Sequence, residues 1–290
     1  MTTKQLYQTF YHHCYLNTGG WIPMMPLATK LELGDFGQIH QSKFMPLGNI
    51  VKLRLVSAIK RTELIPLNPW DWRLEAGLEK TAGNTQSQSQ TLEDGLETQC
   101  AWTTHSLSFK QKGDFVFHGL KPEARFITNW SEFMQDITLK LTQVEYSFRE
   151  VYVVTAIASV NQWGLAIAGA DDAQLEMVAQ TSDADYFAAL SHETVIALQS
   201  RHIARFETSA KRTAYFFKAK KLVLSAQKTD QLINQMLQPS EGLGPDELAN
   251  WLSADLLNRV RVNELNAANC LDYFDWADVS LNDVEKLCQI

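Results

Sequence analysis

The sequence is poor in the residue patterns that mark most enzymes and metal-binding proteins. Its 290 residues include four cysteines and no Cys-x-x-Cys pair, which argues against structural zinc and against a disulfide framework. It has no G-x-G-x-x-G loop, no P-loop and no G-x-S-x-G elbow. His192-Glu193 begins the zinc-protease pattern H-E-x-x-H, but Ile196 stands where the second histidine is needed. These absences predict a protein without catalytic residues, a metal site or a cofactor.

The N-terminus lacks an apolar leader, because Met1 is followed by polar residues and no hydrophobic region of a signal peptide. This predicts a cytoplasmic protein with reduced thiols.

Charge is unevenly distributed. The net charge is -7, and residues 227–290 hold eleven acidic and four basic residues, so residues 1–226 are balanced. A basic stretch precedes the acidic end, and its members are Arg201, Arg205, Lys211, Arg212, Lys218, Lys220 and Lys221. These charges indicate either ordinary solvated faces or a surface for lipid headgroups or nucleic acid that the acidic end covers.

Residues 151–170 form a run without Asp, Glu, Lys or Arg, interrupted by polar residues at its centre. Those polar residues argue against a transmembrane helix, and a β-hairpin turning at Asn161-Gln162 is predicted instead. The hairpin is either buried core or able to cross a bilayer, since membrane strands need about 9–11 residues. The candidate membrane-inserting residues are Val151, Tyr152, Val153, Val154, Ile157, Trp163, Leu165 and Ile167.

The remaining patterns predict an α+β fold: a twisted mixed or antiparallel sheet with flanking helices and a C-terminal helical segment. Helices are expected near 3–16, 129–141, 184–198 and 228–237, and the polar segment 83–99 is expected to be a loop or a mobile hairpin tip. Strands are expected at 29–39, 43–55, 70–80, 101–109, 115–120, 174–178, 203–207 and 214–224. The predicted division is a sheet-rich domain, 1–226, and an acidic helical segment, 227–290.

Two segments near the chain ends suggest regulation. Cys14 lies on the predicted amphipathic helix 3–16, where it is either a buried hydrophobe or an acceptor for a fatty acyl chain. A linker at 239–244 precedes a helix whose apolar residues are the candidate autoinhibitory contacts, Leu248, Trp251, Leu252 and Leu256.

The order of these elements resembles that of bacterial gasdermin-like proteins. The residues that carry the resemblance are the N-terminal helix with Cys14, the segment 151–178 with its Tyr152-Val153-Val154-Thr155 entry, and the closing strand at 214–222. The chain departs from the family in its longer C-terminal segment and in the position of Cys14, which lies further from the N-terminus than the family's modified cysteine.

The resemblance implies an autoinhibited pore-forming protein of bacterial antiviral defence and cell death. A protease would cut near 239–244, the basic residues would meet anionic lipid at the inner membrane, and hairpins from segments 70–104 and 151–178 would insert as a homo-oligomer. The alternative is a non-catalytic accessory or regulatory subunit that binds nucleic acid or a protein partner through its basic strand. An enzyme assembled from distant residues is a third possibility.

Overall fold

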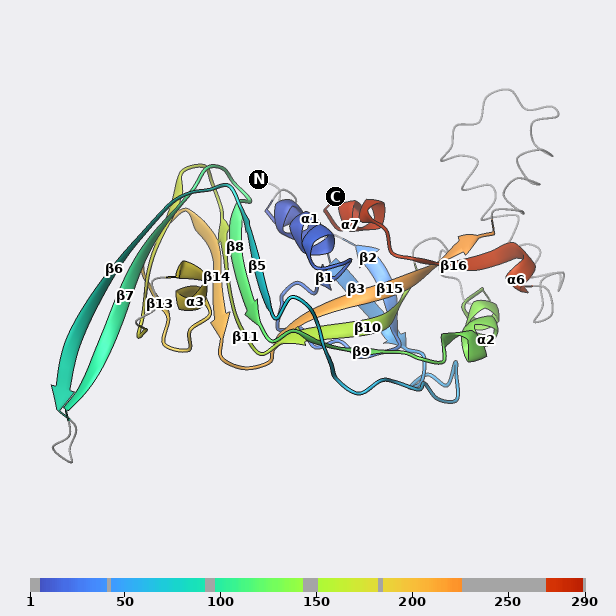
Figure 1. Cartoon of the computed structure of the whole chain (residues 1–290). Coiled ribbons are helices and arrows are strands. Elements are labelled where there is room, and N and C mark those ends of the chain that lie inside the picture. The colour runs from blue at the N-terminus through green and yellow to red at the C-terminus, as the bar shows by residue number, and fades with distance from the viewer. Residues whose placement is uncertain are drawn as a thin grey trace, which may run out of the picture.

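The computed structural model describes residues 6–40, 43–91, 97–142, 151–181, 185–225 and 270–288. It confirms the α+β class, with antiparallel sheets and flanking helices (Figure 1). The helices are α1 (Gln8–Asn17), α2 (Trp130–Thr142), α3 (Tyr186–Leu190), α6 (Cys270–Tyr273) and α7 (Leu281–Cys288). Among the described residues, none of these helices has the length and apolar character needed to cross a bilayer.

One sheet, the core sheet, holds eight strands. Its members are β1 (Ile22–Pro23), β2 (Asp35–His40), β3 (Lys43–Asn49), β4 (Ile65–Pro66), β9 (Glu123–Phe126), β10 (Tyr152–Val160), β15 (Ala214–Leu224) and β16 (Phe274–Asp278). The central strand, β10, pairs antiparallel with β15 along its length and with β2 and β9 on its other side.

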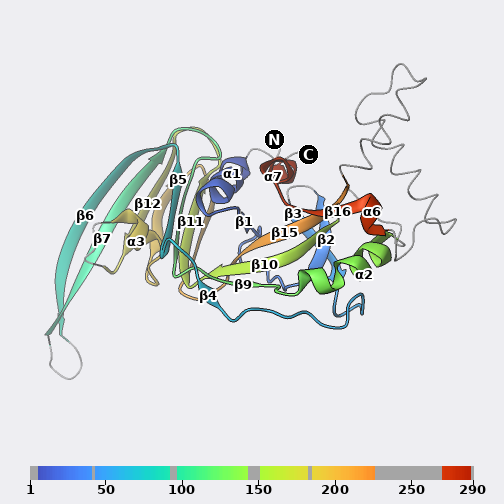
Figure 2. The ribbon, with the colours of Figure 1, turned by 45° about the vertical axis from the view of Figure 1, so that its right-hand side comes forward.

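The composition of β10 explains its central position. The strand is apolar on both faces, so it is stable only where both faces are covered. Its residues Val153, Val154 and Ala158 are fully buried. α1 covers one face through Phe10 and Cys14, and Figure 2 shows α1 and α7 on the same side of the core sheet.

The predicted hairpin at residues 151–170 is wrong. β10 and β11 (Gln162–Ala168) follow each other across Asn161 but do not pair, because β11 belongs to a different sheet. β10 finds its partners in β15, β2 and β9, whereas β11 pairs with β8 and β14. Two strands that each need neighbours on both sides obtain them from segments distant in sequence.

The other two sheets have four strands each and share one neighbour order. The inner layer, next to α1, is β14 (Ile203–Ser209), β11, β8 (Phe115–Leu120) and β5 (Asp71–Ala76); the outer layer is β13 (Ile196–Arg201), β12 (Ala173–Ala179), β7 (Glu97–Phe109) and β6 (Leu78–Thr91). Each inner strand continues along the chain into the outer strand at the same place in the order. The two layers are therefore one four-stranded sheet folded over, which we call the folded sheet (Figure 1).

The folded sheet decides between two alternatives and corrects one further prediction. For the polar segment at 83–99, predicted as a loop or a mobile hairpin tip, the structure has a long hairpin of β6 and β7 where it describes the segment. The helix predicted at 184–198 is confined to α3, and β13 begins at Ile196.

Candidate functional site

The candidate functional site is the folded sheet together with the line along which it bends. We call this line the crest; it consists of Gly77, residues 110–114, residues 169–172 and His202. The chain crosses the crest four times, so the folded sheet is built from two hairpins, residues 71–120 and 162–209. Figures 1 and 2 both show the two layers joined at this edge.

Gly77 and Asp114 hold the crest at one side. Gly77 has φ +66°, and a Cβ atom there would overlap the Asp114 carboxylate. That carboxylate is 2% exposed and accepts a hydrogen bond from the Gln111 backbone N–H at 2.8 Å. Only glycine fits this close approach at positive φ, so the bend depends on this residue.

The two central strands of the folded sheet are the segment that runs from β7 into β8 and the segment that runs from β11 into β12. Backbone hydrogen bonds join these two strands at the crest. The Gly113 N–H donates to the Ala168 carbonyl at 2.9 Å, and the Ala168 N–H donates to the Asp114 carbonyl at 2.8 Å. Where β13 passes into β14, the Gly169 N–H donates to the His202 carbonyl at 2.7 Å. The crest is therefore a bend in a hydrogen-bonded sheet rather than a break between two sheets.

Helix α3 lies between the two layers as a wedge. It contacts β8 and β11 of the inner layer and β7 and β12 of the outer layer. A Cβ atom at Gly164 of β11 would overlap the Leu190 carbonyl, so the end of α3 rests directly on the inner layer. Asp185 caps the helix by accepting a hydrogen bond from the Phe187 N–H at 3.0 Å.

Polar side chains of the inner layer hold the wedge. Arg73 donates from Nη1 to Asp185 Oδ2 at 2.6 Å and from Nε to Asp71 Oδ2 at 2.6 Å. The Tyr186 hydroxyl bonds the carboxylate of Glu75. Burial, assisted by that bond, raises the pKa of Tyr186, so its hydroxyl stays a donor at neutral pH.

His118 lies beneath the wedge. Its Nδ1 atom is 2.8 Å from Ser191 Oγ, and its Nε2 atom is 3.9 Å from Asp71 Oδ2. Burial lowers the pKa of His118, and Arg73 adds to this, while the Phe187 backbone, Asp71 and Asp185 oppose it. The neutral ring is therefore the form that fits under α3.

The grouping of Ser191, His118 and Asp71 has the residue types of a hydrolase triad. Ser191 and His118 are 2% and 1% exposed, so the serine hydroxyl has no access to a substrate in this conformation. We read the group as part of the contact between α3 and the inner layer. Sequence reasoning missed it, because the three residues are distant in sequence and no motif links them.

The predicted membrane-inserting residues are divided between two sheets. Val151, Tyr152, Val153, Val154 and Ile157 lie in or beside β10 of the core sheet, and all except the half-buried Ile157 are fully covered. The other three, Trp163, Leu165 and Ile167, lie in β11 of the folded sheet and face the core next to α1.

The predicted lipid-binding cations do not form one face. Arg201 and Arg205 lie on β13 and β14 of the folded sheet, and Lys211 and Arg212 follow β14. Lys218, Lys220 and Lys221 lie on β15 of the core sheet.

Several of these cations already have partners. Arg205 pairs with Glu207, and Arg212 pairs with Glu123. The Lys218 ammonium lies 5.0 Å from the centre of the Trp21 ring, and burial lowers its pKa. These contacts reduce the charge that is available to an external anion.

The acidic end of the chain covers the end of β15. β16 pairs antiparallel with β15, with Asp278 opposite Lys220 and Trp276 opposite Leu222. The Lys220 ammonium lies 2.8 Å from Asp278 Oδ1, and the Lys221 ammonium lies 2.6 Å from Asp283 Oδ2. Two of the predicted cations thus meet carboxylates of the acidic segment.

Trp276 anchors β16 in the core. It is 8% exposed, donates from Nε1 to Thr138 Oγ1 of α2 at 2.8 Å, and meets the Trp130 ring edge-on at 5.0 Å. The predicted autoinhibitory residues Leu248, Trp251, Leu252 and Leu256, and the predicted cut site at 239–244, lie outside the described residues.

Cys14, the predicted acylation site, is 0% exposed within the core between α1 and the sheets. Burial raises the pKa of its thiol well above the ordinary value, so the thiolate that reacts with acyl donors is disfavoured in this conformation.

No protein-family model and no curated protein matches the sequence. One solved structure with some likeness is the cryo-EM structure of the gasdermin A3 membrane pore. The match covers 75% of this chain and 88% of that chain, at 9% identity and a TM-score of 0.31. The likeness is a weak one at the level of the fold.

Proposed function

We propose that the protein is an autoinhibited pore former, in which the folded sheet straightens at the crest and enters a bilayer as two β-hairpins. The observation that carries this proposal is the register of the two central strands. It is the same on both sides of the crest.

In the outer layer Phe109 pairs with Ala173, and in the inner layer Phe115 pairs with Ile167. Five residues separate these pairs on each strand, 110–114 on one and 168–172 on the other. Residues 103–120 and 162–179 can therefore join into one uninterrupted antiparallel pair without slipping. At about 3.3 Å per residue such a pair is roughly 60 Å long, which exceeds the thickness of a bilayer core of about 30 Å.

Straightening also places most large apolar residues of the central strands on one face, which they share with Asp171, while Val116, Ala166 and Ala168 lie on the other face. On one strand, Trp163, Leu165 and Ile167 fall on the same side as Leu175 and Met177, because alternate residues share a face. On the next strand Leu107, Phe109, Phe115 and Phe117 share a face, and Ser106, Ser108, Gln174 and Glu176 lie on the opposite one. An apolar face toward lipid and a polar face toward water is the pattern of membrane β-strands.

The edge strands of the folded sheet, β5, β6, β13 and β14, require a partner copy. Pairing of β5 and β6 with the central strands changes register across the crest, as does pairing of β13 and β14, so these strands must slip when the sheet straightens. β6 and β13 are also edges of the outer layer. Their backbone groups would be unsatisfied in lipid, and pairing between copies in a closed ring would satisfy them. The active form is therefore a homo-oligomer.

The acidic segment 227–290 acts as the inhibitor in this proposal. β16 pairs with the edge of β15, and carboxylates of β16 and α7 form ion pairs with Lys220 and Lys221 of β15. A protease cut near 239–244 would convert the part of this segment that follows the cut, with β16 and α7, to a separate chain that can dissociate. Lys220, Lys221 and the exposed Arg201 would then be free to attract anionic lipid, at about 1 kcal/mol per residue close to the surface. Cys14 becomes available for acylation only when α1 leaves the core.

Leakage from vesicles tests the proposal. A specific protease site replaces residues 239–244, and dye release from phosphatidylcholine vesicles with and without phosphatidylserine is followed before and after cutting. We expect release only from cut protein and only with the anionic lipid. Intact protein that shifts a nucleic acid on a gel, while cut protein leaves vesicles sealed, would favour the accessory subunit instead.

A further inference from the structure

We propose that the core sheet carries a binding site for a small organic phosphate, with the phosphate between Arg61 and Arg125 and an apolar group against the apolar side chains of the lining. The site is a cavity of about 610 Å³, which is in the range of small-molecule sites. It lies against β9, β10 and β15, away from the folded sheet and its wedge. It plays no part in the pore proposal.

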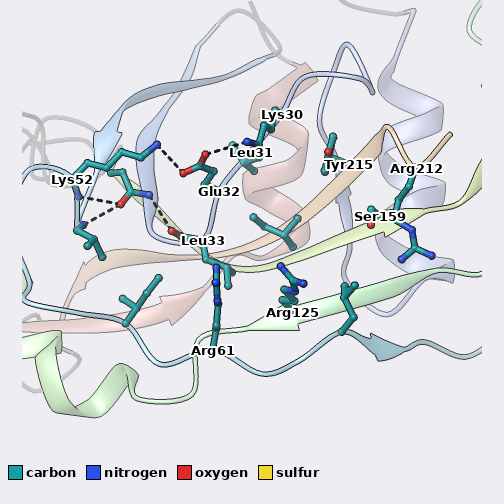
Figure 3. A pocket seen from close by; sticks show the side chains of 15 residues that line it. Lys30, Leu31, Glu32, Leu33, Lys52, Arg61, Arg125, Ser159, Arg212 and Tyr215 are labelled. Carbon is teal, nitrogen blue, oxygen red and sulfur yellow. Dashed lines mark hydrogen bonds and ion pairs between the residues drawn. The ribbon is translucent and has the colours of Figure 1, made fainter.

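The charge of the lining is strongly positive. Five of its residues are Lys or Arg and one is acidic: Lys30, Lys52, Arg61, Arg125, Arg212 and Glu32. Figure 3 shows the three arginines along one side of the cavity, with the lysines and Glu32 on the other side.

Carboxylates neutralise only part of this charge. Glu32 is shared by Lys52 at 2.7 Å and Lys30 at 3.4 Å, and Arg212 pairs with Glu123. Within the described part of the chain, Arg61 and Arg125 form no ion pair and no side-chain hydrogen bond. Two free guanidinium groups at one cavity suit phosphate, because each offers a planar fork of donors to its oxygens.

The backbone holds the two arginines next to each other. Arg125 lies on β9 opposite Ile157 of β10, and Arg61 forms a backbone bridge with Ile127, two residues further along the chain from Arg125. Side chains at 125 and 127 share a face of an extended strand, so the bridge places Arg61 close to Arg125. The pair is therefore positioned by sheet hydrogen bonds rather than by a loose surface loop.

The rest of the lining selects an organic ligand over a bare ion. Apolar side chains of Leu31, Leu33, Ile59, Leu64 and Ile157 contribute to the wall, and Tyr215 also lines the cavity. A phospholipid headgroup is polar throughout and would leave this wall facing water. A ligand with phosphate at one end and an aromatic or apolar group at the other covers both parts, which favours a soluble phosphate ester such as a nucleotide.

Calorimetry on the full-length protein tests the site, with ATP, pyrophosphate and adenosine as probes. We expect salt-dependent binding of ATP, weaker binding of pyrophosphate and none of adenosine. Arg61→Gln and Arg125→Gln should each weaken ATP binding by about tenfold or more, since each removes charge-assisted hydrogen bonds.

The matched control is Lys60→Gln. It removes the same charge one residue from Arg61, but Lys60 faces Glu132 at 2.7 Å and does not line the cavity. ATP affinity should stay within about twofold of the wild-type value. The melting temperature of each variant reports on folding.

Three outcomes overturn the proposal. The first is no binding of ATP or pyrophosphate, and the second is equal binding by wild type and both arginine variants. The third is binding of phosphatidylserine vesicles that needs Arg61 and Arg125 and that ATP does not reduce, which would make the cavity a lipid-headgroup site. All three are independent of vesicle leakage, so failure here leaves the pore proposal standing.

Discussion

The Lys221 ammonium lies 2.6 Å from both carboxylate oxygens of Asp283, which joins β15 of the core sheet to α7 at the end of the chain. Asp283 also accepts hydrogen bonds from the backbone N–H and the hydroxyl of Ser280. Burial raises the pKa of Asp283, but the bonds from Lys221 and Ser280 outweigh it, so the net pKa is below its ordinary 3.8. The ionised pair therefore stabilises the fold above pH 3.8 and is lost as the pH falls through the lower, folded-state pKa.

Asp283→Asn should reduce the free energy of unfolding by about 2 kcal/mol, because Lys221 then keeps its charge without a carboxylate in a largely covered site. Urea denaturation measures this loss. The control is Asp278→Asn, whose side chain is 82% exposed and pairs with the adjacent Lys220. Its cost should stay under about 0.5 kcal/mol. Equal costs for the two variants would show that α7 is not held by Asp283.

Gly77→Ala should destabilise the folded sheet, because the new methyl group overlaps the Asp114 carboxylate at a backbone φ of +66°. Gly19→Ala is the matched control: its φ is +77°, but nothing lies within 4 Å of the added carbon. The difference between the two variants removes the common cost of positive φ. We expect Gly77→Ala to lose at least about 1 kcal/mol more in urea denaturation. Matching losses would mean that the crest does not need this close approach.

Acid should weaken the contact of α3 with the inner layer. Since the folded-state pKa of His118 is below 6.5, the unfolded chain binds a proton at a higher pH than the folded chain does. The stability of the folded state is therefore expected to fall as the pH drops below 6.5 toward the folded-state pKa. His118→Gln should flatten this dependence in denaturation curves. An unchanged slope in the variant would assign the effect to another group.

The two faces of β12 should respond differently to charge once the protein is cut. Gln174→Lys places a charge on the polar face of the straightened strand and should leave dye release near that of wild type. Leu175→Lys places it on the lipid-facing side, at a cost of about 2–4 kcal/mol near the centre of a bilayer, and should abolish release. Leu175 is buried, so circular dichroism must first show that the variant folds. Equal release from two folded variants would contradict the assigned faces.

Local patterns predicted some of this architecture well. The apolar, β-branched start of the segment at 151–170 indicated a buried strand, and β10 is the central strand of the core sheet. The opposite charges of the acidic end and the basic stretch indicated contact, and Asp278 and Asp283 do meet Lys220 and Lys221.

Long-range pairing could not be predicted in the same way. Asn161-Gln162 is a reasonable turn signal, yet it marks a passage between two sheets because β8 and β15 compete successfully for the strands on either side. The polar composition of β6 left a loop and a hairpin tip as alternatives, and the segment forms a strand beside β7, where the Thr85 and Thr103 hydroxyls lie 3.1 Å apart. The shared register across the crest depends on pairs more than forty residues apart, which no local pattern encodes.

The length of one central strand tests the central claim most directly. Spin labels at Thr104 and Leu120 lie on strands of different layers, at opposite ends of one bent segment. If the sheet straightens, pulsed electron spin resonance on cut protein bound to anionic vesicles should show a distance of roughly 50 Å, from about 3.3 Å per residue. Intact protein should give a shorter distance. The same distance before cutting and on the membrane would contradict the account.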